Sequence, residues 1–202
     1  TKYFDSNVDA HLVVHAPELF ENDHTLDLCS PNEEYRRQSV DHMKRTIEAA
    51  VRLRKYFNNA DSKIGIITNV GGFSNDGALN KKEITEREAI LERSLAELQD
   101  PRVEIWPQTM PPFPWHFGGQ QYHNLFLDAD WIVDFCRRNG TRVCLDISHS
   151  ILHCNHMKRS PSLFLEKVLP FTAHLHLADG SGVDGEGLQI NEGDVDFHLM
   201  AE

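Results

Sequence analysis

Residues 142–150, Arg-Val-Cys-Leu-Asp-Ile-Ser-His-Ser, decide the fold, because they join a short apolar run to a carboxylate and an imidazole. The run is typical of a buried strand, and Asp146 and His149 follow at its carboxyl end. Four more stretches share this design: HLVVHAPE from His11, IGIITNVGG from Ile64, VEIWPQTMPP from Val103 and HLHLADGSG from His174. Short apolar runs of this kind, bounded by Gly or Pro, indicate buried parallel strands.

The five runs predict strands over residues 11–15, 63–70, 103–106, 142–147 and 172–177, with amphipathic stretches of helical length between them. Alternating strands and helices predict an α/β fold of the TIM (β/α)8 barrel type. A complete barrel of this type takes about 250 residues, whereas the chain has 202. We therefore expect a single barrel domain over residues 1–202, incomplete at the termini and part of a longer chain.

Helix starts are predicted from capping residues. Ser30 before Pro31 is expected to cap the first helix, and Thr85 with Glu88 forms a predicted capping box for the second. Asp128 is expected to cap a helix that stops at Gly140. A further helix is predicted to start at Ser160-Pro161, and the glycine-rich acidic stretch 180–196 is expected to be one long loop.

Composition limits the function classes. The net charge of −11 argues against nucleic acid and against anionic membrane surfaces, since both attract basic proteins. The four cysteines form no CxxC pair, and this favours a reduced, cytoplasmic setting. The sequence contains no signal peptide and no apolar run long enough to cross a membrane.

Several candidate site residues stand at predicted strand ends, which meet at one mouth of such a barrel. Asp146, His149 and His176 offer oxygen and nitrogen ligands that suit a divalent ion such as Zn, Mn or Co. Gln108 follows the third strand and stands beside this set. The alternative for Asp146 is a helix cap, with His149 packed in the core.

Other polar residues near the same strand ends are predicted to contact a substrate. His15 and Asn69 follow the first and second strands, and Trp115 with His116 lies in the loop after the third. Aromatic rings in such loops pack against sugars, although they also serve as structural lids. Asp184 and Glu186 in the acidic loop are the candidate catalytic carboxylates.

The stretches HAPE, DISHS and HLHLAD, followed by GVDGEGLQINEGDVDF, resemble the xylose isomerase-like TIM-barrel superfamily of sugar-phosphate isomerases, epimerases and the endonuclease IV branch. The resemblance implies that Asp146, His149 and His176 hold a metal. Gln108 stands where that family places a metal-binding Glu. A second such Glu belongs to the last barrel strand, which this chain does not contain.

Three functions follow from these residues and the resemblance. The leading hypothesis is a metal-dependent sugar or sugar-phosphate isomerase or epimerase that moves a proton through an enediolate. The second is a non-catalytic carbohydrate-binding or regulatory barrel domain of a multidomain sugar-biosynthesis protein, which the neutral Gln108 favours. The third, an endonuclease IV-like phosphodiesterase, is disfavoured by the acidic charge. The expected partner is a small sugar or sugar phosphate, with homo-oligomers or covalently linked domains both left open.

Overall fold

The computed structural model describes residues 11–57, 63–114, 118 and 120–197. Its central feature is a row of five parallel strands in chain order. A single bridge between Gln108 and Cys144 joins the third strand to the fourth. The strands are β1 (Val13–His15), β4 (Ile64–Thr68), β6 (Val103–Pro107), β8 (Val143–Asp146) and β9 (Thr172–His176). All five predicted strands therefore form, with small differences at their ends.

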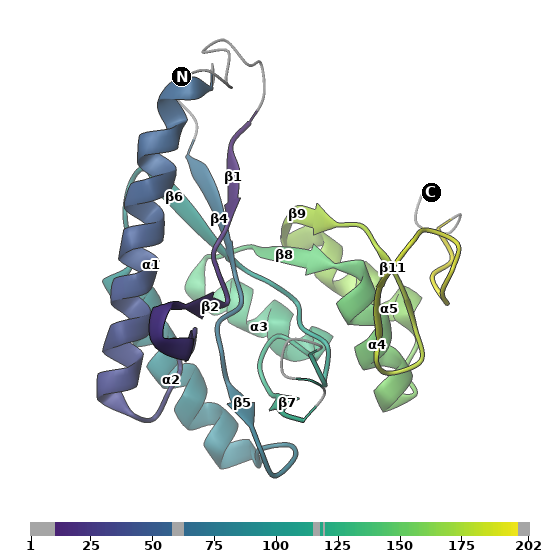
Figure 1. The fold of residues 1–202 in the computed structure, drawn as a ribbon. Helices are drawn as coiled ribbons and strands as arrows, with labels where there is room; N and C mark the ends of the chain where they lie inside the picture. Colours follow the sequence, from purple (N-terminus) through teal and green to yellow (C-terminus); the bar gives the residue numbers. More distant parts are fainter. Residues whose placement is uncertain (1–10, 58–62, 115–117, 119, 198–202) are drawn as a thin grey trace.

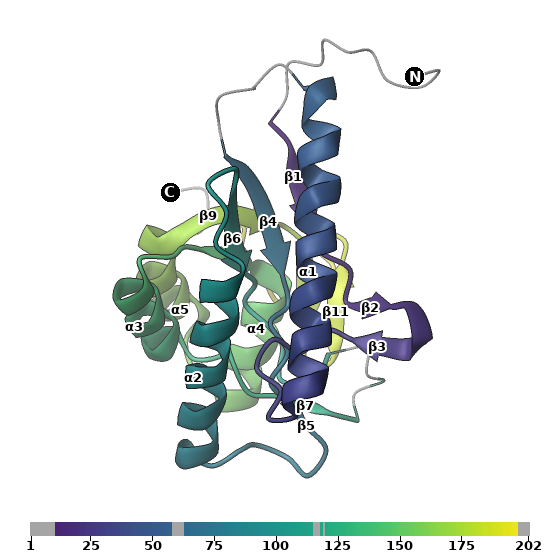
Figure 2. The same cartoon turned by 90° about the vertical axis from the view of Figure 1, so that its left-hand side faces the viewer.

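A helix or a helix pair connects each strand to the next, as the alternating pattern predicts. The helices are α1 (Glu33–Leu53), α2 (Lys81–Glu97), α3 (Ala129–Asn139), α4 (Ile147–Met157) and α5 (Pro161–Val168). Helix α1 runs the length of β1 and β4 on one side (Figure 1), and α1 and α2 stand in front of β4 and β6 when viewed from that side (Figure 2). Short 3-10 turns are also present among the described residues, at Glu21–Asp23, Arg54–Tyr56 and Leu169–Phe171.

The main core lies between the strands and these helices. The apolar side chains that point toward the helices belong to one cluster, which includes Ile64, Ile66, Val103, Val143 and Leu145. Helix α1 presents a buried stripe to this cluster at helical spacing: Val40, Met43, Ile47 and Ala50. These are the residues whose spacing predicts the helix, since i, i+3, i+4 and i+7 positions share one face.

The opposite face of the strands carries a second, smaller cluster. It is formed by Ile67, Trp106 and Cys144, with Val13 and Ala173 packed against them. Trp106 lies over Gly65, where an added Cβ would come within 2.1 Å of the indole ring. Gly65 therefore makes room for the largest side chain on the inner face of the strands.

Short antiparallel strand pairs, two of them hairpins, follow the carboxyl ends of the parallel strands in the described part of the chain. They pair β2 (Leu19–Phe20) with β3 (His24–Thr25), β5 (Phe73–Ser74) with β7 (Tyr122–His123), and β10 (Asp179–Ser181) with β11 (Gly185–Leu188). The prediction of one long loop over 180–196 is therefore wrong in part. Asp179 is fully buried and accepts hydrogen bonds from the backbone amides of Gly180, Gly193 and Val195, which hold the segment together.

Two predicted helix starts are also wrong. The side chain of Asn32 accepts from the amides of Glu34 and Tyr35, so Asn32 caps α1 in place of Ser30. Asn80 with Glu83 forms the capping box of α2, and Thr85 lies inside that helix. In both cases a better-placed Asn supplies the capping oxygen. The predicted caps Asp128 and Ser160 are confirmed.

No helix among the described residues is both long and apolar enough to span a membrane.

Candidate functional site at the strand ends

The carboxyl ends of the strands bring six of the predicted site residues together. His15, Asp146 and His176 end β1, β8 and β9, whereas Gln108 follows β6 directly. His149 lies in the first turn of α4, and Glu186 lies in β11. Most of these residues border a cavity of about 490 Å³ lined by His15, Ala16, Pro17, Glu18, Gln108, Asp146, His149 and Glu186.

Gln108 is the centre of this group, and only 4% of it is exposed. Its Oε1 accepts from His15 Nε2 at 2.8 Å, and its Nε2 donates to Asp146 Oδ2 at 3.0 Å. The same Nε2 lies 3.2 Å from His176 Nδ1. Because Gln108 also forms the bridge between β6 and β8, the sheet itself fixes its position.

Asp146 has two functions in the structure. Its Oδ1 accepts from the backbone amide of His149 at 3.0 Å and so caps α4, while Oδ2 lies 3.3 Å from His176 Nδ1. Burial acts to raise the pKa of Asp146, but the hydrogen bond to His176 and the charge of His149 outweigh it and lower that pKa. The carboxylate is therefore held in its charged form at the cavity wall.

His149 links three segments of the chain through both ring nitrogens. Nδ1 donates to the Thr109 carbonyl at 2.8 Å, and Nε2 donates to Glu186 Oε1 at 2.9 Å. Burial opposes protonation of this imidazole, but the Glu186 hydrogen bond and the Asp146 charge raise its pKa to about 9. With both nitrogens acting as donors, His149 connects the hairpin of Glu186 to the loop after β6.

Glu186 reaches the site from the β10–β11 hairpin. The hairpin is fastened to α4 next to His149, since the Gly187 amide donates to Ser148 Oγ at 2.9 Å. The side chain of Glu186 is 12% exposed. Its Oε2 atom is buried and has no hydrogen-bond partner among the described residues. An unpartnered buried carboxylate oxygen is uncommon and calls for a functional or solvent explanation.

Two further candidates do not join this group. Asn69 is buried, but its Oδ1 accepts from the Gly71 amide and from His123 Nε2, so the side chain orders the loop after β4. Asp184 is exposed at the turn of the β10–β11 hairpin and is not among the residues that line the cavity. The candidates Trp115 and His116 lie outside the described residues.

Sequence reasoning missed two members of the site. Thr109 exchanges hydrogen bonds with the backbone of Asp146 through its hydroxyl, and its carbonyl holds His149. Glu18 lines the cavity beside His15. Both follow the end of a predicted strand by three residues, so their position after a strand could have identified them.

The ligands for a divalent ion are only partly present. Asp146 Oδ2 and His176 Nδ1 lie close enough to share an ion, and the Gln108 amide stands beside both. His149 directs both nitrogens to other partners. Among the described residues, no group of three or more His, Cys, Asp or Glu side chains is placed to hold a metal. Two strong ligands and an amide fall short of the three protein ligands of a catalytic zinc site.

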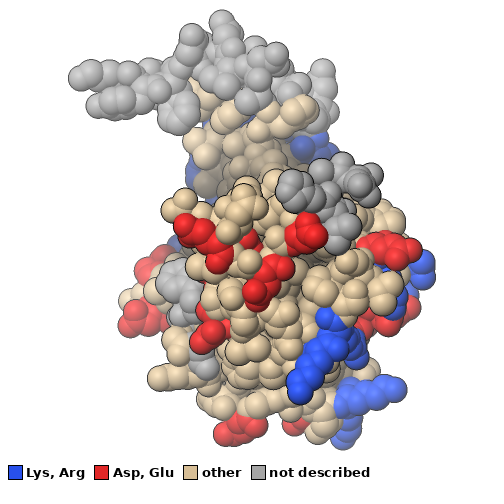
Figure 3. Space-filling view, turned by 90° about the vertical axis from the view of Figure 1, so that its right-hand side faces the viewer, with Lys and Arg blue, Asp and Glu red and all other residues tan. Residues whose placement is uncertain are grey.

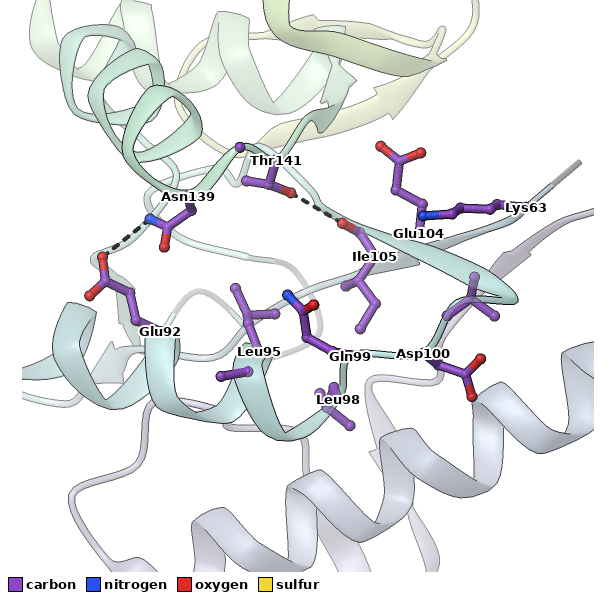
Figure 4. A pocket seen from close by; sticks show the side chains of 13 residues that line it. Lys63, Glu92, Leu95, Leu98, Gln99, Asp100, Glu104, Ile105, Asn139 and Thr141 are labelled. Carbon is purple, nitrogen blue, oxygen red and sulfur yellow. Dashed lines mark hydrogen bonds between the residues drawn. The ribbon is translucent and has the colours of Figure 1, made fainter.

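A second hollow of about 480 Å³ lies at the opposite, amino ends of β4 and β6. Figure 4 shows its walls, where Glu92 is hydrogen-bonded to Asn139 and Thr141 to the Ile105 carbonyl. It contains no histidine and gathers no comparable set of converging groups. Since barrel active sites lie at the carboxyl ends of the strands, the cavity around Gln108 is the better candidate.

Solved structures with similar folds include proteins named as sugar epimerases or as epimerase-like. A D-tagatose 3-epimerase-like protein matches with a TM-score of 0.65 and 23% identity over 93% of this chain and 63% of its own. A 3-keto-D-glucoside 4-epimerase from E. coli matches with a TM-score of 0.62 and 12% identity, over 94% of this chain and 65% of its own. An L-ribulose 3-epimerase matches with a TM-score of 0.61 and 14% identity, over 96% of this chain and 56% of its own.

The chain thus spans between about half and two thirds of the length of these structures, which agrees with the prediction of an incomplete barrel. Among curated proteins, the comparison finds no match. The profile of one protein family, described as xylose isomerase-like TIM barrel, matches residues 2–202. The resemblance and the fold class predicted from the sequence are therefore confirmed, and the chain belongs to the xylose isomerase-like TIM-barrel family.

Proposed function

We propose that this chain provides part of the active site of a sugar or sugar-phosphate isomerase or epimerase. The observation that supports the proposal is the convergence of His15, Gln108, Asp146 and Glu186 on one polar cavity at the carboxyl ends of the strands. His176 lies beside this cavity, next to Asp146 and Gln108. Hydrogen-bonding groups on a rigid scaffold suit a small ligand with many hydroxyls. Several of the similar structures are named as sugar epimerases, which supports the same substrate class.

In this proposal the chain binds a ketose through its oxygens. Gln108 and His15 come from different strands and stand where a hydroxyl or carbonyl oxygen could exchange hydrogen bonds with them. Fixing the sugar in this way aligns a C–H bond next to the carbonyl with a base, which lowers the entropic part of the barrier. The reaction is the movement of a proton between the two faces of one carbon or between neighbouring carbons.

We also propose a divalent cofactor, Zn, Mn or Co, with Asp146 and His176 as its two strong ligands and the Gln108 amide beside them, which is a weaker set than the three protein ligands of a catalytic zinc site. His149, the fourth residue of the predicted set, would not bind the ion. It would hold the Glu186 side chain in place through its hydrogen bond. The cofactor would be tested by mass spectrometry of the purified chain, beside an Asp146→Ala/His176→Ala control. We expect metal that is lost in the control, whereas no metal after supplementation would contradict this part.

The function is tested with D-tagatose, D-psicose and L-ribulose, the sugars named for similar structures. Binding is measured by calorimetry and conversion by chromatography, with and without Mn²⁺. We expect binding of at least one ketose, and loss of that binding in Gln108→Ala, which removes the centre of the hydrogen-bond group. The absence of binding and of conversion for every sugar would contradict the proposal.

One observation favours a second candidate, a carbohydrate-binding domain without catalysis. Gln108 is a neutral amide at the centre of the site, and an amide cannot act as a base at neutral pH. Ketose binding that persists without conversion or solvent exchange would favour this candidate. A phosphodiesterase of the endonuclease type has less support, because the described part of the chain places no Lys or Arg at the cavity wall.

A further inference from the structure

We infer that Glu186 is the base of this site, the group that takes a proton from the carbon next to the ketose carbonyl. The inference rests on the proposed function and adds the residue that moves the proton. The two carboxylate oxygens of Glu186 differ in their surroundings. Oε1 accepts a hydrogen bond from His149, whereas Oε2 has no hydrogen-bond partner among the described residues.

The surroundings of Glu186 fix one oxygen and leave the other to the ligand. The hydrogen bond from His149 Nε2 to Oε1 is 2.9 Å long, and His149 is itself held by the Thr109 carbonyl. The next residue, Gly187, is tied to Ser148. Glu186 therefore has a defined direction, at the wall of the same cavity that His15 and Gln108 border. Oε2 is therefore the one oxygen of this carboxylate that no described group occupies, and it remains available to a ligand in the cavity.

The other carboxylates near the cavity are less suited to this step. Both oxygens of Asp146 are engaged, Oδ1 by the His149 amide and Oδ2 by Gln108 and His176. Asp184 is exposed at the hairpin turn. Glu18 lines the cavity from the β1 side and is the one rival that the experiment must separate from Glu186.

The proposed step balances without an oxidant or reductant. The C–H bond next to the carbonyl breaks and its proton forms an O–H bond with Glu186 Oε2. The electron pair of that bond forms the C=C bond of an enediolate, and the carbonyl π electrons move to the oxygen. Return of the proton restores the C–H bond, and exchange with solvent deuterium in between labels the carbon.

The experiment measures this exchange by proton NMR in D₂O, using D-tagatose, D-psicose and L-ribulose with the full 202-residue chain and Mn²⁺. Glu186→Gln keeps an oxygen to accept from His149 but replaces the other oxygen with an amide. Glu192→Gln, an exposed carboxylate in the same segment, is the matched control, and Glu18→Gln tests the rival. Ketose affinity and thermal unfolding of each variant are measured in parallel, because a structural role would change these as well.

We expect exchange in the wild type and in Glu192→Gln, and a loss of about 100-fold or more in Glu186→Gln with ketose affinity retained. If Glu186→Gln fails to fold, Glu186→Asp, which keeps the carboxylate, is expected to fold and to retain part of the exchange. Exchange at the wild-type rate in Glu186→Gln, or loss in Glu18→Gln alone, overturns the inference while the proposed function stands. A wild type that binds no ketose and exchanges none overturns both.

Discussion

Gly65 is the residue where the inner face of the sheet is most tightly constrained. A Cβ at this position would lie 2.1 Å from Trp106 Cζ3 and 2.3 Å from Cη2, so the indole must shift. Overpacking of this kind costs about 1–3 kcal/mol. We expect Gly65→Ala to lower the free energy of unfolding by that amount in urea titrations.

A double-mutant cycle identifies the cause. If the clash with the indole is responsible, Gly65→Ala costs much less in a Trp106→Leu background, with a coupling energy of about 1 kcal/mol or more. Additive effects of the two substitutions would show that Gly65 is needed for another reason, such as strand conformation.

His153 is a residue whose burial makes stability depend on pH. It is 4% exposed in α4, and both ring nitrogens lack a hydrogen-bond partner among the described residues. Burial lowers its pKa to about 4, against about 6.5 in an unfolded chain. Between these values the unfolded chain binds more protons, so stability is complete above pH 6.5 and falls as the pH drops toward 4.

This pKa difference corresponds to a loss of at most about 3 kcal/mol in the free energy of unfolding. Urea titrations at pH 7.5, 6, 5 and 4.5 are expected to show that His153→Leu loses less stability over this range than the wild type. His156→Leu, an exposed histidine on the same helix, is the control substitution. Equal pH profiles for the wild type and His153→Leu would contradict the prediction.

The β10–β11 hairpin is the element on which the site depends most. The fully buried carboxylate of Asp179 accepts hydrogen bonds from three backbone amides in this segment. Removing the carboxylate leaves buried donors without acceptors, each at a cost of about 1–3 kcal/mol. We expect Asp179→Ala to raise hydrogen–deuterium exchange at least tenfold in residues 180–195, measured by mass spectrometry. Glu192→Ala is the control, and unchanged protection in Asp179→Ala would show that β10–β11 pairing alone orders the hairpin.

The same hairpin shows what sequence could not predict. Its strands are short, and glycine-rich segments have no apolar alternation to reveal them. Without the turn geometry, Asp184 and Glu186 were equivalent candidates, although the structure places only Glu186 beside His149. By contrast, the strand-end rule found His15, Gln108, Asp146 and His176, because buried parallel strands carry a strong sequence signal and end at a common edge.

At the scale of the whole molecule, the order of the parallel strands follows from sequence alone, since each amphipathic stretch joins neighbouring strands. The short pairings of β2 with β3 and β5 with β7 were not predictable. The pairing of β5 with β7 depends on contacts between loops that are distant in the chain, such as Asn124 donating to the Gly72 carbonyl. The β2–β3 pair is local, but its strands have only two residues each. Local sequence patterns do not contain that information.

The charge distribution of the whole molecule bears on the choice between sugars and sugar phosphates. The net charge is −11, and Figure 3 shows acidic side chains across the middle of one face, with Lys and Arg on one side of its lower part. The described residues that border the cavity include Glu18, Asp146 and Glu186 and no Lys or Arg. Carboxylates repel a phosphate group, and focused fields in a cleft strengthen the effect.

We therefore expect a neutral ketose to bind at least about tenfold more tightly than its phosphate ester, a difference of about 1.4 kcal/mol. Because salt screens this repulsion, raising the salt concentration from 50 to about 300 mM is expected to reduce the difference in affinity between the two ligands. The affinity for the neutral sugar is expected to change little. Calorimetric titrations of D-tagatose and a ketohexose phosphate at both salt concentrations measure this. Tighter binding of the phosphate at low salt would mean that a cationic group outside the described cavity contacts the ligand, and the substrate class would then be a sugar phosphate.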